Sequence, residues 1–252
     1  MNIMFKILVV EDDKNLRKLI VTCLEKSNYT VFETRNGEEA LELMDKEYVD
    51  LIVTDIMMPE MDGVTLCRKL KNDIQTSHIP VILLSAKSDS EDVLRGYESG
   101  AEVYVSKPFD PQILELQVNN IIGMKRAQQA RMVDAKVDEV NSAQLNNLDK
   151  EFINKINKLI EQNIDNDEFS VATVTREMGI SRSFLHIKMK NLLNVSMGDY
   201  IRKKRLNMAC ELLKQGFNVS ETAYRTGFAD PNYFSKAFKK EFGLTPTEYM
   251  DK

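Results

Sequence analysis

The chain has 252 residues, of which 43% are apolar and 29% are charged, and its formal net charge is −5. That length suits two ordinary domains, since about 100 to 200 residues per domain is usual. The composition is that of a globular protein and excludes disordered and fibrous classes. No apolar run reaches the roughly 18 to 20 residues that cross a membrane, and the first residues lack the pattern of a signal peptide. We therefore expect a cytoplasmic protein that makes no membrane contact.

Cysteine and histidine are too sparse for a metal centre built from them. The three cysteines lie far apart without a C-x-x-C spacing, and there are only two histidines. A disulfide framework or a zinc site is therefore not expected.

Charge is distributed unevenly along the chain. Residues 1–130 carry 15 Lys and Arg against 22 Asp and Glu, whereas residues 168–252 carry 14 against 9. A basic C-terminal third is compatible with a nucleic-acid surface, although a solvated helix face gives the same pattern.

The first half of the chain alternates short apolar runs with amphipathic helical patterns. The runs that we predict to be strands are FKILVV (5–10), YTVFET (29–34), DLIVT (50–54), PVILLS (80–85) and EVYVS (102–106). Strands separated by helices favour a parallel sheet with helices on both faces, in the doubly wound α/β class.

Asp55 follows an apolar run directly and precedes turn residues, in VDLIVTDIMMPEMDG (49–63). A short buried strand would place this carboxylate at the carboxyl edge of the sheet, where ligands bind in open α/β folds. A helix N-cap or turn aspartate is the alternative for an isolated Asp. The choice depends on what the other strands bring to the same edge.

Four predicted strands end in groups of complementary chemistry. Glu11, Asp12 and Asp13 follow the first strand, while Ser85 and Lys107 end the fourth and fifth, 30 and 52 residues after Asp55. Clustered carboxylates favour a hard dication, and Mg²⁺ takes one or two carboxylates together with waters and phosphate oxygens. The pattern predicts a site where Asp55 accepts a phosphoryl group and where Ser85 and Lys107 bind its oxygens.

The motifs ILVVEDD, DIMMPEMDG, the SA after strand four and KPF resemble those of the receiver domain of bacterial two-component response regulators, from Phe5 to about Gly123. The resemblance implies a flavodoxin-like fold, phosphorylation by a histidine kinase and a cis Lys107–Pro108 bond. It also assigns the Mg²⁺ ligands. These are Asp12, Asp55, the backbone carbonyl of Met57 and, through water, Glu11.

The same resemblance implies a switch. A phosphoryl group on Asp55 would draw in Ser85, and the ring of Tyr104 would then turn inward. A tyrosine that serves only in core packing is the alternative for Tyr104.

The chain beyond Gly123 begins with a polar segment that has the pattern of an extended helix. We predict a helical linker over 124–148. Domain boundaries follow as 1–123 for the receiver and 149–252 for a second, all-helical domain.

The C-terminal third repeats one plan. SVATVTREMGISRSFLHIKMKNLL (170–193) and NVSETAYRTGFADPNYFSKAFKKEFG (218–243) each contain a short helix, a glycine turn, an N-cap residue and a second helix. These are two helix-turn-helix units, joined by a long helix over about 199–214.

The second helix of each unit carries outward polar side chains that suit contacts with bases and phosphates. Residues from about Leu148 to Tyr249 resemble the AraC-type DNA-binding domain, whose two recognition helices enter successive major grooves. That resemblance makes promoter DNA the partner. The candidate contacts are Arg182, Ser183, His186 and Lys190 in the first unit and Asn232, Lys236 and Lys239 in the second.

Taken together, the two halves predict a transcription regulator controlled by phosphorylation in a phosphorelay. The order of domains also resembles the output end of hybrid sensor kinases. We expect a homodimer when the chain is phosphorylated, with RNA polymerase as a further possible partner. A degenerate receiver that serves as a dimer scaffold for a constitutive DNA-binding protein is the alternative.

An enzyme is the less favoured class. A Mg²⁺-dependent phosphatase with an aspartate nucleophile would place a second acid two residues after Asp55, and Met57 stands there. No general acid is then positioned to protonate a leaving group.

Overall fold

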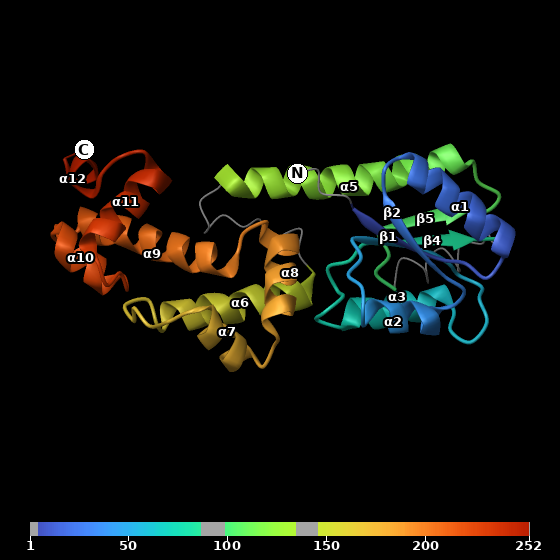
Figure 1. Ribbon diagram of the computed structural model, residues 1–252, viewed down its shortest axis with the longest axis horizontal. Coiled ribbons are helices and arrows are strands. Elements are labelled where there is room, and N and C mark those ends of the chain that lie inside the picture. Colours follow the sequence, from blue (N-terminus) through green and yellow to red (C-terminus); the bar gives the residue numbers. More distant parts are fainter. Residues whose placement is uncertain (1–4, 87–98, 135–145, 252) are drawn as a thin grey trace. The chain divides into compact units, whose positions relative to one another are not determined.

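The computed structural model of the protein describes residues 5–86, 99–134 and 146–251. The chain forms two compact units, Met1–Gln128 and Gln129–Lys252 (Figure 1). The boundary lies within helix α5 (Pro111–Asp134). Of the predicted linker, residues 124–134 are helical, whereas residues 135–145 are outside the described part of the chain.

The first unit is built on a five-stranded parallel sheet in the order β2-β1-β3-β4-β5. Its strands are β1 (Lys6–Val10), β2 (Thr30–Thr34), β3 (Leu51–Asp55), β4 (Val81–Ser85) and β5 (Val103–Ser106). The order changes direction between β1 and β3, and in open α/β sheets such a reversal opens a ligand crevice at the carboxyl ends of the strands.

Helices cover both faces of this sheet, which confirms the doubly wound α/β prediction (Figure 1). One face holds α1 (Lys14–Lys26) and α5, and the other holds α2 (Gly37–Met44) and α3 (Gly63–Asn72). Each face has its own apolar core, because side chains alternate across the strands. All residues of β3 and β4 are buried.

The secondary-structure elements described in the second unit are all helices, joined by short turns and loops. Its helices are α6 (Asn147–Glu161), α7 (Val171–Met178), α8 (Arg182–Leu193), α9 (Met197–Lys214), α10 (Val219–Arg225), α11 (Pro231–Phe242) and α12 (Pro246–Met250). The pairs α7–α8 and α10–α11 are the two predicted helix-turn-helix units. The turn glycines Gly179 and Gly227 have φ values of 65° and 70°, a left-handed conformation that favours glycine.

The predicted N-caps of both helix-turn-helix units are present, and each second helix buries one apolar face. The side chains of Ser181 and Asp230 accept backbone N–H groups at the starts of α8 and α11, which satisfies donors that have no partner inside the helix. Leu185 and Met189 are fully buried on α8. On α11, Phe234 and Phe238 are fully buried with ring centroids 5.7 Å apart.

A buried ion pair joins α6 to α8. The Lys188 Nζ lies 2.5 Å from the Asp149 Oδ1, and the two side chains are 0% and 3% exposed. The ammonium group also lies 5.5 Å from the ring centroid of Phe152. The basic pattern of α8 did not reveal that one of its lysines points inward.

We predict that Asp149→Asn lowers the free energy of unfolding of the second unit by about 3 to 5 kcal/mol, because it removes the carboxylate charge that pairs with the buried Lys188 ammonium. Urea denaturation followed by circular dichroism measures this loss.

The double variant Asp149→Leu with Lys188→Met provides the control. Replacing both charges with apolar groups of similar volume should recover most of the loss. A double variant as unstable as the single one would show that the pair itself does not account for the effect.

Candidate functional site

The carboxyl ends of β1, β3, β4 and β5 bring the predicted site residues to one edge of the sheet. Glu11 and Asp12 follow β1, Asp55 ends β3 and Ser85 ends β4. Asp55 is in register with Leu84, the residue before Ser85. Ser85 is in register with Ser106, the residue before Lys107. Residues far apart in the sequence therefore lie on neighbouring strand ends.

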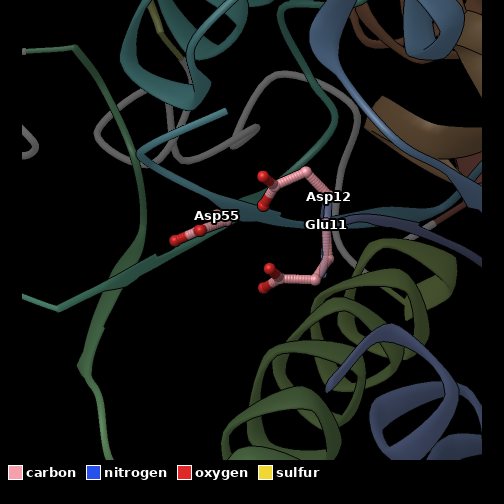
Figure 2. Close-up of side chains that lie close together, drawn as sticks. All are labelled: Glu11, Asp12 and Asp55. Atoms are coloured by element: carbon pink, nitrogen blue, oxygen red, sulfur yellow. The ribbon is translucent and has the colours of Figure 1, made fainter. Parts of the chain in front are cut away.

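Three carboxylates form the centre of the site. One oxygen from each of Glu11, Asp12 and Asp55 lies within 4.8 Å of the others (Figure 2). Glu11 and Asp55 are buried, at 1% and 7% exposure, while Asp12 is exposed. The cluster is thus open to solvent on the Asp12 side.

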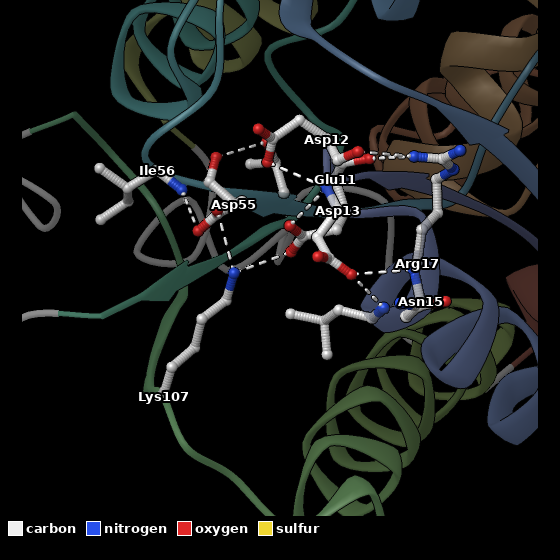
Figure 3. A network of polar contacts seen from close by, with 10 residues as sticks. Glu11, Asp12, Asp13, Asn15, Arg17, Asp55, Ile56 and Lys107 are labelled. Atoms are coloured by element: carbon white, nitrogen blue, oxygen red, sulfur yellow. Dashed lines mark hydrogen bonds and ion pairs between the residues drawn. The ribbon is translucent and has the colours of Figure 1, made fainter.

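Lys107 joins two of these carboxylates. Its Nζ lies 2.8 Å from the Glu11 Oε2 and 3.0 Å from the Asp55 Oδ2 (Figure 3). The Lys107–Pro108 peptide bond is cis, as predicted. One ammonium group therefore partly neutralises the two buried carboxylates, and the exposed Asp12 adds a third negative charge.

Burial dominates the electrostatics of the cluster. Desolvation raises the pKa of Glu11, and the hydrogen bond from Lys107 only partly offsets it. Desolvation likewise raises the pKa of Asp55 against the opposing effect of Lys107, and the charge of Asp12 raises it further. Burial lowers the pKa of Lys107, but its bonds to Glu11 and Asp55 outweigh that effect and raise it overall. The carboxylates are thus held in an electrostatically unfavourable state.

The donor set of the cluster fits Mg²⁺. All three groups offer carboxylate oxygens, two from buried residues and one from an exposed residue, and hard dications prefer oxygen ligands. A cation here would also offset burial and the charge of Asp12, both of which raise the pKa of Asp55. The residues that would hold it are Glu11, Asp12 and Asp55.

Two residues that support the acidic loop were not predicted to do so. The Arg17 guanidinium, which is 9% exposed, donates to the backbone carbonyl of Glu11 at 2.6 Å and to that of Asp12 at 3.2 Å. The Asp13 carboxylate caps α1 by accepting the backbone N–H groups of Asn15 and Leu16 (Figure 3). Asp13 is therefore a helix cap beside the cluster. The sequence signal that could have indicated the Arg17 contact is an arginine four residues after the N-cap residue Asp13.

The turn after Asp55 closes back on the strand. The Gly63 N–H donates to the Ile56 carbonyl at 2.9 Å. A Cβ at Gly63 would lie 2.0 Å from the Asp55 carbonyl oxygen, so only glycine fits this position. The Asp55 side chain accepts the Ile56 N–H at 2.9 Å. The Ile56 N–H thus orients the Asp55 carboxylate, while Gly63 lets the turn pack closely against the backbone of Asp55.

The remaining predicted receiver residues surround this centre. Ser85 is 3% exposed. Tyr104 is half-buried and packs against the core cluster on the α2 and α3 face. Met57 lies in the turn after β3 with a side chain that is 63% exposed. The roles proposed for Ser85, Tyr104 and Met57 apply to a phosphorylated, metal-bound state of the domain.

The predicted DNA contacts all lie on exposed positions of α8 and α11. They are Arg182, Ser183, His186, Lys190, Asn232, Lys236 and Lys239. Tyr233, beside Asn232 on the same helix, is also exposed at 52%, and its ring lies 6.1 Å from that of Phe228. It was not among the candidate contacts predicted from the sequence.

Comparisons with protein families match both units. The model described as the response regulator receiver domain matches residues 7–119, and the model described as a helix-turn-helix domain matches residues 174–252. The chain therefore contains a response regulator receiver domain, followed by a C-terminal helix-turn-helix domain of the AraC type.

Three relatives show different extents of similarity. Histidine kinase P4 of Formosa agariphila is 38% identical over 98% of this chain, which spans 18% of that kinase. The probable transcriptional regulator ycf27 of Cyanidium caldarium is 37% identical over 61% of each protein. The transcriptional regulatory protein HptR of Staphylococcus aureus is 26% identical over 98% of each. The chain thus spans less than two thirds of the first two relatives.

None of the helices in the described ranges could span a membrane.

We predict that Asp12→Asn raises the free energy of unfolding of the metal-free protein by about 0.5 kcal/mol. The substitution removes a like charge from Asp55, and the gain is small because water screens the exposed Asp12. Thermal unfolding in the presence of a chelator measures it.

The repulsion between Asp12 and Asp55 should also affect how the stability of the protein depends on pH. A carboxyl whose folded pKa is raised contributes stability below its unfolded pKa that is lost as the pH rises through the folded value. The contribution of Asp55 to the stability of the metal-free wild-type protein should therefore grow when the pH falls from 7 toward the ordinary aspartate value of 3.8. A smaller gain is expected for Asp12→Asn. An equal gain in both proteins would contradict the proposed repulsion.

Proposed function

We propose that this chain is a transcription regulator whose receiver domain is phosphorylated on Asp55 and whose helix-turn-helix units bind promoter DNA. The observation that carries the proposal is the bridge from Lys107 to Glu11 and Asp55 beside the exposed carboxylate of Asp12. A histidine kinase is the proposed phosphoryl donor.

Asp55 is the proposed nucleophile because it is ionisable, oriented by the backbone and close to a cation. An oxygen of its carboxylate would form a bond to the phosphorus of a phosphohistidine, and the phosphorus–nitrogen bond would break. Bound Mg²⁺ would supply charge neutralisation for the phosphoryl oxygens, with the Met57 carbonyl as a further proposed ligand. Lys107, which now bonds to the Asp55 Oδ2, would move its hydrogen bond to the new phosphoryl group.

The proposed response to phosphorylation involves β4 and β5. The Ser85 hydroxyl, one register step beyond Asp55, would donate to a phosphoryl oxygen. Tyr104 lies on the neighbouring strand and is half-buried, and its ring would turn inward into the space that Ser85 leaves. We propose that this rearrangement favours a homodimer and DNA binding. RNA polymerase is a further proposed partner of the DNA-bound form.

The second unit presents two helices suited to the major groove. Side chains on α8 and α11 that the fold leaves exposed are mainly basic or amide groups, which contact phosphates and base edges. Because one chain contains both helices, the proposed binding site is long and asymmetric.

We predict that Asp55→Ala abolishes phosphoryl incorporation from labelled acetyl phosphate in the presence of Mg²⁺. No other carboxylate in the cluster bonds to both Lys107 and the backbone N–H of Ile56. The measurement is the radiolabel retained by the denatured protein.

Asp45→Asn is the matched control, because Asp45 is an exposed carboxylate at the end of α2, away from the cluster. It should incorporate label as the wild type does. Labelling that survives in Asp55→Ala would remove Asp55 as the acceptor.

We predict that Lys236→Ala weakens DNA binding and lowers the salt dependence of the affinity by about one unit of slope, as expected when one phosphate contact is lost. Binding isotherms over a salt series measure both quantities. Lys158→Ala, an exposed lysine on α6, should leave both unchanged. Equal behaviour of the two variants would exclude Lys236 from the interface.

A further inference from the structure

Arg205 is a buried arginine in the middle of α9, the helix between the two helix-turn-helix units. Its side chain is 9% exposed, although it belongs to the basic sequence RKKR (202–205). Its Nη2 donates to the backbone carbonyl of Asn166. Its Nε is buried without a hydrogen-bond partner. A buried guanidinium is costly unless its N–H groups are hydrogen-bonded and its charge is compensated.

The carbonyl that Arg205 binds lies in the loop before the first helix-turn-helix unit. The same Asn166 carbonyl accepts the backbone N–H of Phe169 at 3.1 Å, and Phe169 is 4% exposed. Ser170, the next residue, is the N-cap of α7. Arg205 therefore anchors the point at which the first unit begins.

The other side of Arg205 contacts the turn of the second helix-turn-helix unit. A Cβ at Gly227 would lie 2.7 Å from the Arg205 Cζ and 2.6 Å from the Ile164 carbonyl oxygen. Gly227 has a left-handed φ of 70°, and its N–H bonds to the Tyr224 carbonyl at 3.1 Å. The loop of the first unit, the Arg205 guanidinium and the turn of the second unit thus meet at one point.

We propose that Arg205 and Gly227 set the spacing between α8 and α11, and thereby the spacing of the two DNA elements that this chain binds. The proposal rests on the proposed DNA binding. Arg205 is a positioning residue, since its guanidinium faces the protein interior and is not available to DNA. Helix α9 connects the two helix-turn-helix units along the chain. The contact through Arg205 connects them a second time and would fix the rotation of one unit relative to the other.

The test begins with the full-length wild-type chain, Mg²⁺ and beryllofluoride, and a library of random-sequence DNA duplexes. Selection should enrich one motif with two elements at a single spacing. Three duplexes are then made from that motif: one intact, one with an element scrambled, and one with two base pairs inserted between the elements.

Arg205→Met should bind the scrambled duplex as the wild type does, while its affinity for the intact duplex falls by about tenfold. Linked binding gains affinity only when both elements can be engaged together. The penalty for the inserted base pairs should also shrink. Arg202→Met, an equal charge change on the exposed side of the same helix, should keep the wild-type spacing preference.

Gly227→Ala disturbs the same contact from the opposite side and should show the same relaxed spacing, so the test does not depend on one variant. Circular dichroism melting establishes that each variant is folded. An unchanged spacing penalty in folded Arg205→Met and Gly227→Ala would overturn the positioning role and leave DNA binding intact. Failure of the wild-type chain to enrich any sequence would overturn both the proposed function and this role.

Discussion

The receiver unit is organised around a single, partly buried ammonium group between two carboxylates. Lys107 contributes the only positive charge that bonds directly to Glu11 and Asp55 among the residues described, and both carboxylates are desolvated enough for their pKa values to be raised. Asp12 adds negative charge without a neutralising partner of this kind. A cation bound beside Asp12 would therefore stabilise the cluster, and the oxygen groups and the lysine that would share it lie together on one edge of the sheet.

The fold and the centre of the site could be predicted because they depend on local patterns. Apolar runs that end in turn residues define buried strands, and parallel strands bring their ends together whatever the sequence separation. Asp55, Ser85 and Lys107 could therefore be placed on one edge from their positions after strands. The cis bond at Pro108 came from the resemblance to receivers, not from the pattern itself.

What could not be predicted depends on which way a side chain points and on contacts between distant segments. Arg17 bonds to carbonyls of the acidic loop, although an arginine in this helical pattern would be taken for a solvent-exposed residue. Lys188 and Arg205 lie in basic stretches and are both buried. Charge alone does not reveal orientation, because the partners, Asp149 and the Asn166 carbonyl, lie 39 residues away in the chain.

The inward position of Lys188 also affects how the charge of α8 should be counted. DNA binding is driven largely by the release of counterions from phosphates, and only cations that reach the phosphates release them. Among the three Arg and Lys residues of α8, Arg182 and Lys190 are exposed, while Lys188 is already neutralised by Asp149. The helix thus offers DNA two exposed positive charges and not three. Its sequence-derived charge overstates its nonspecific attraction to DNA and leaves more of the discrimination to base contacts.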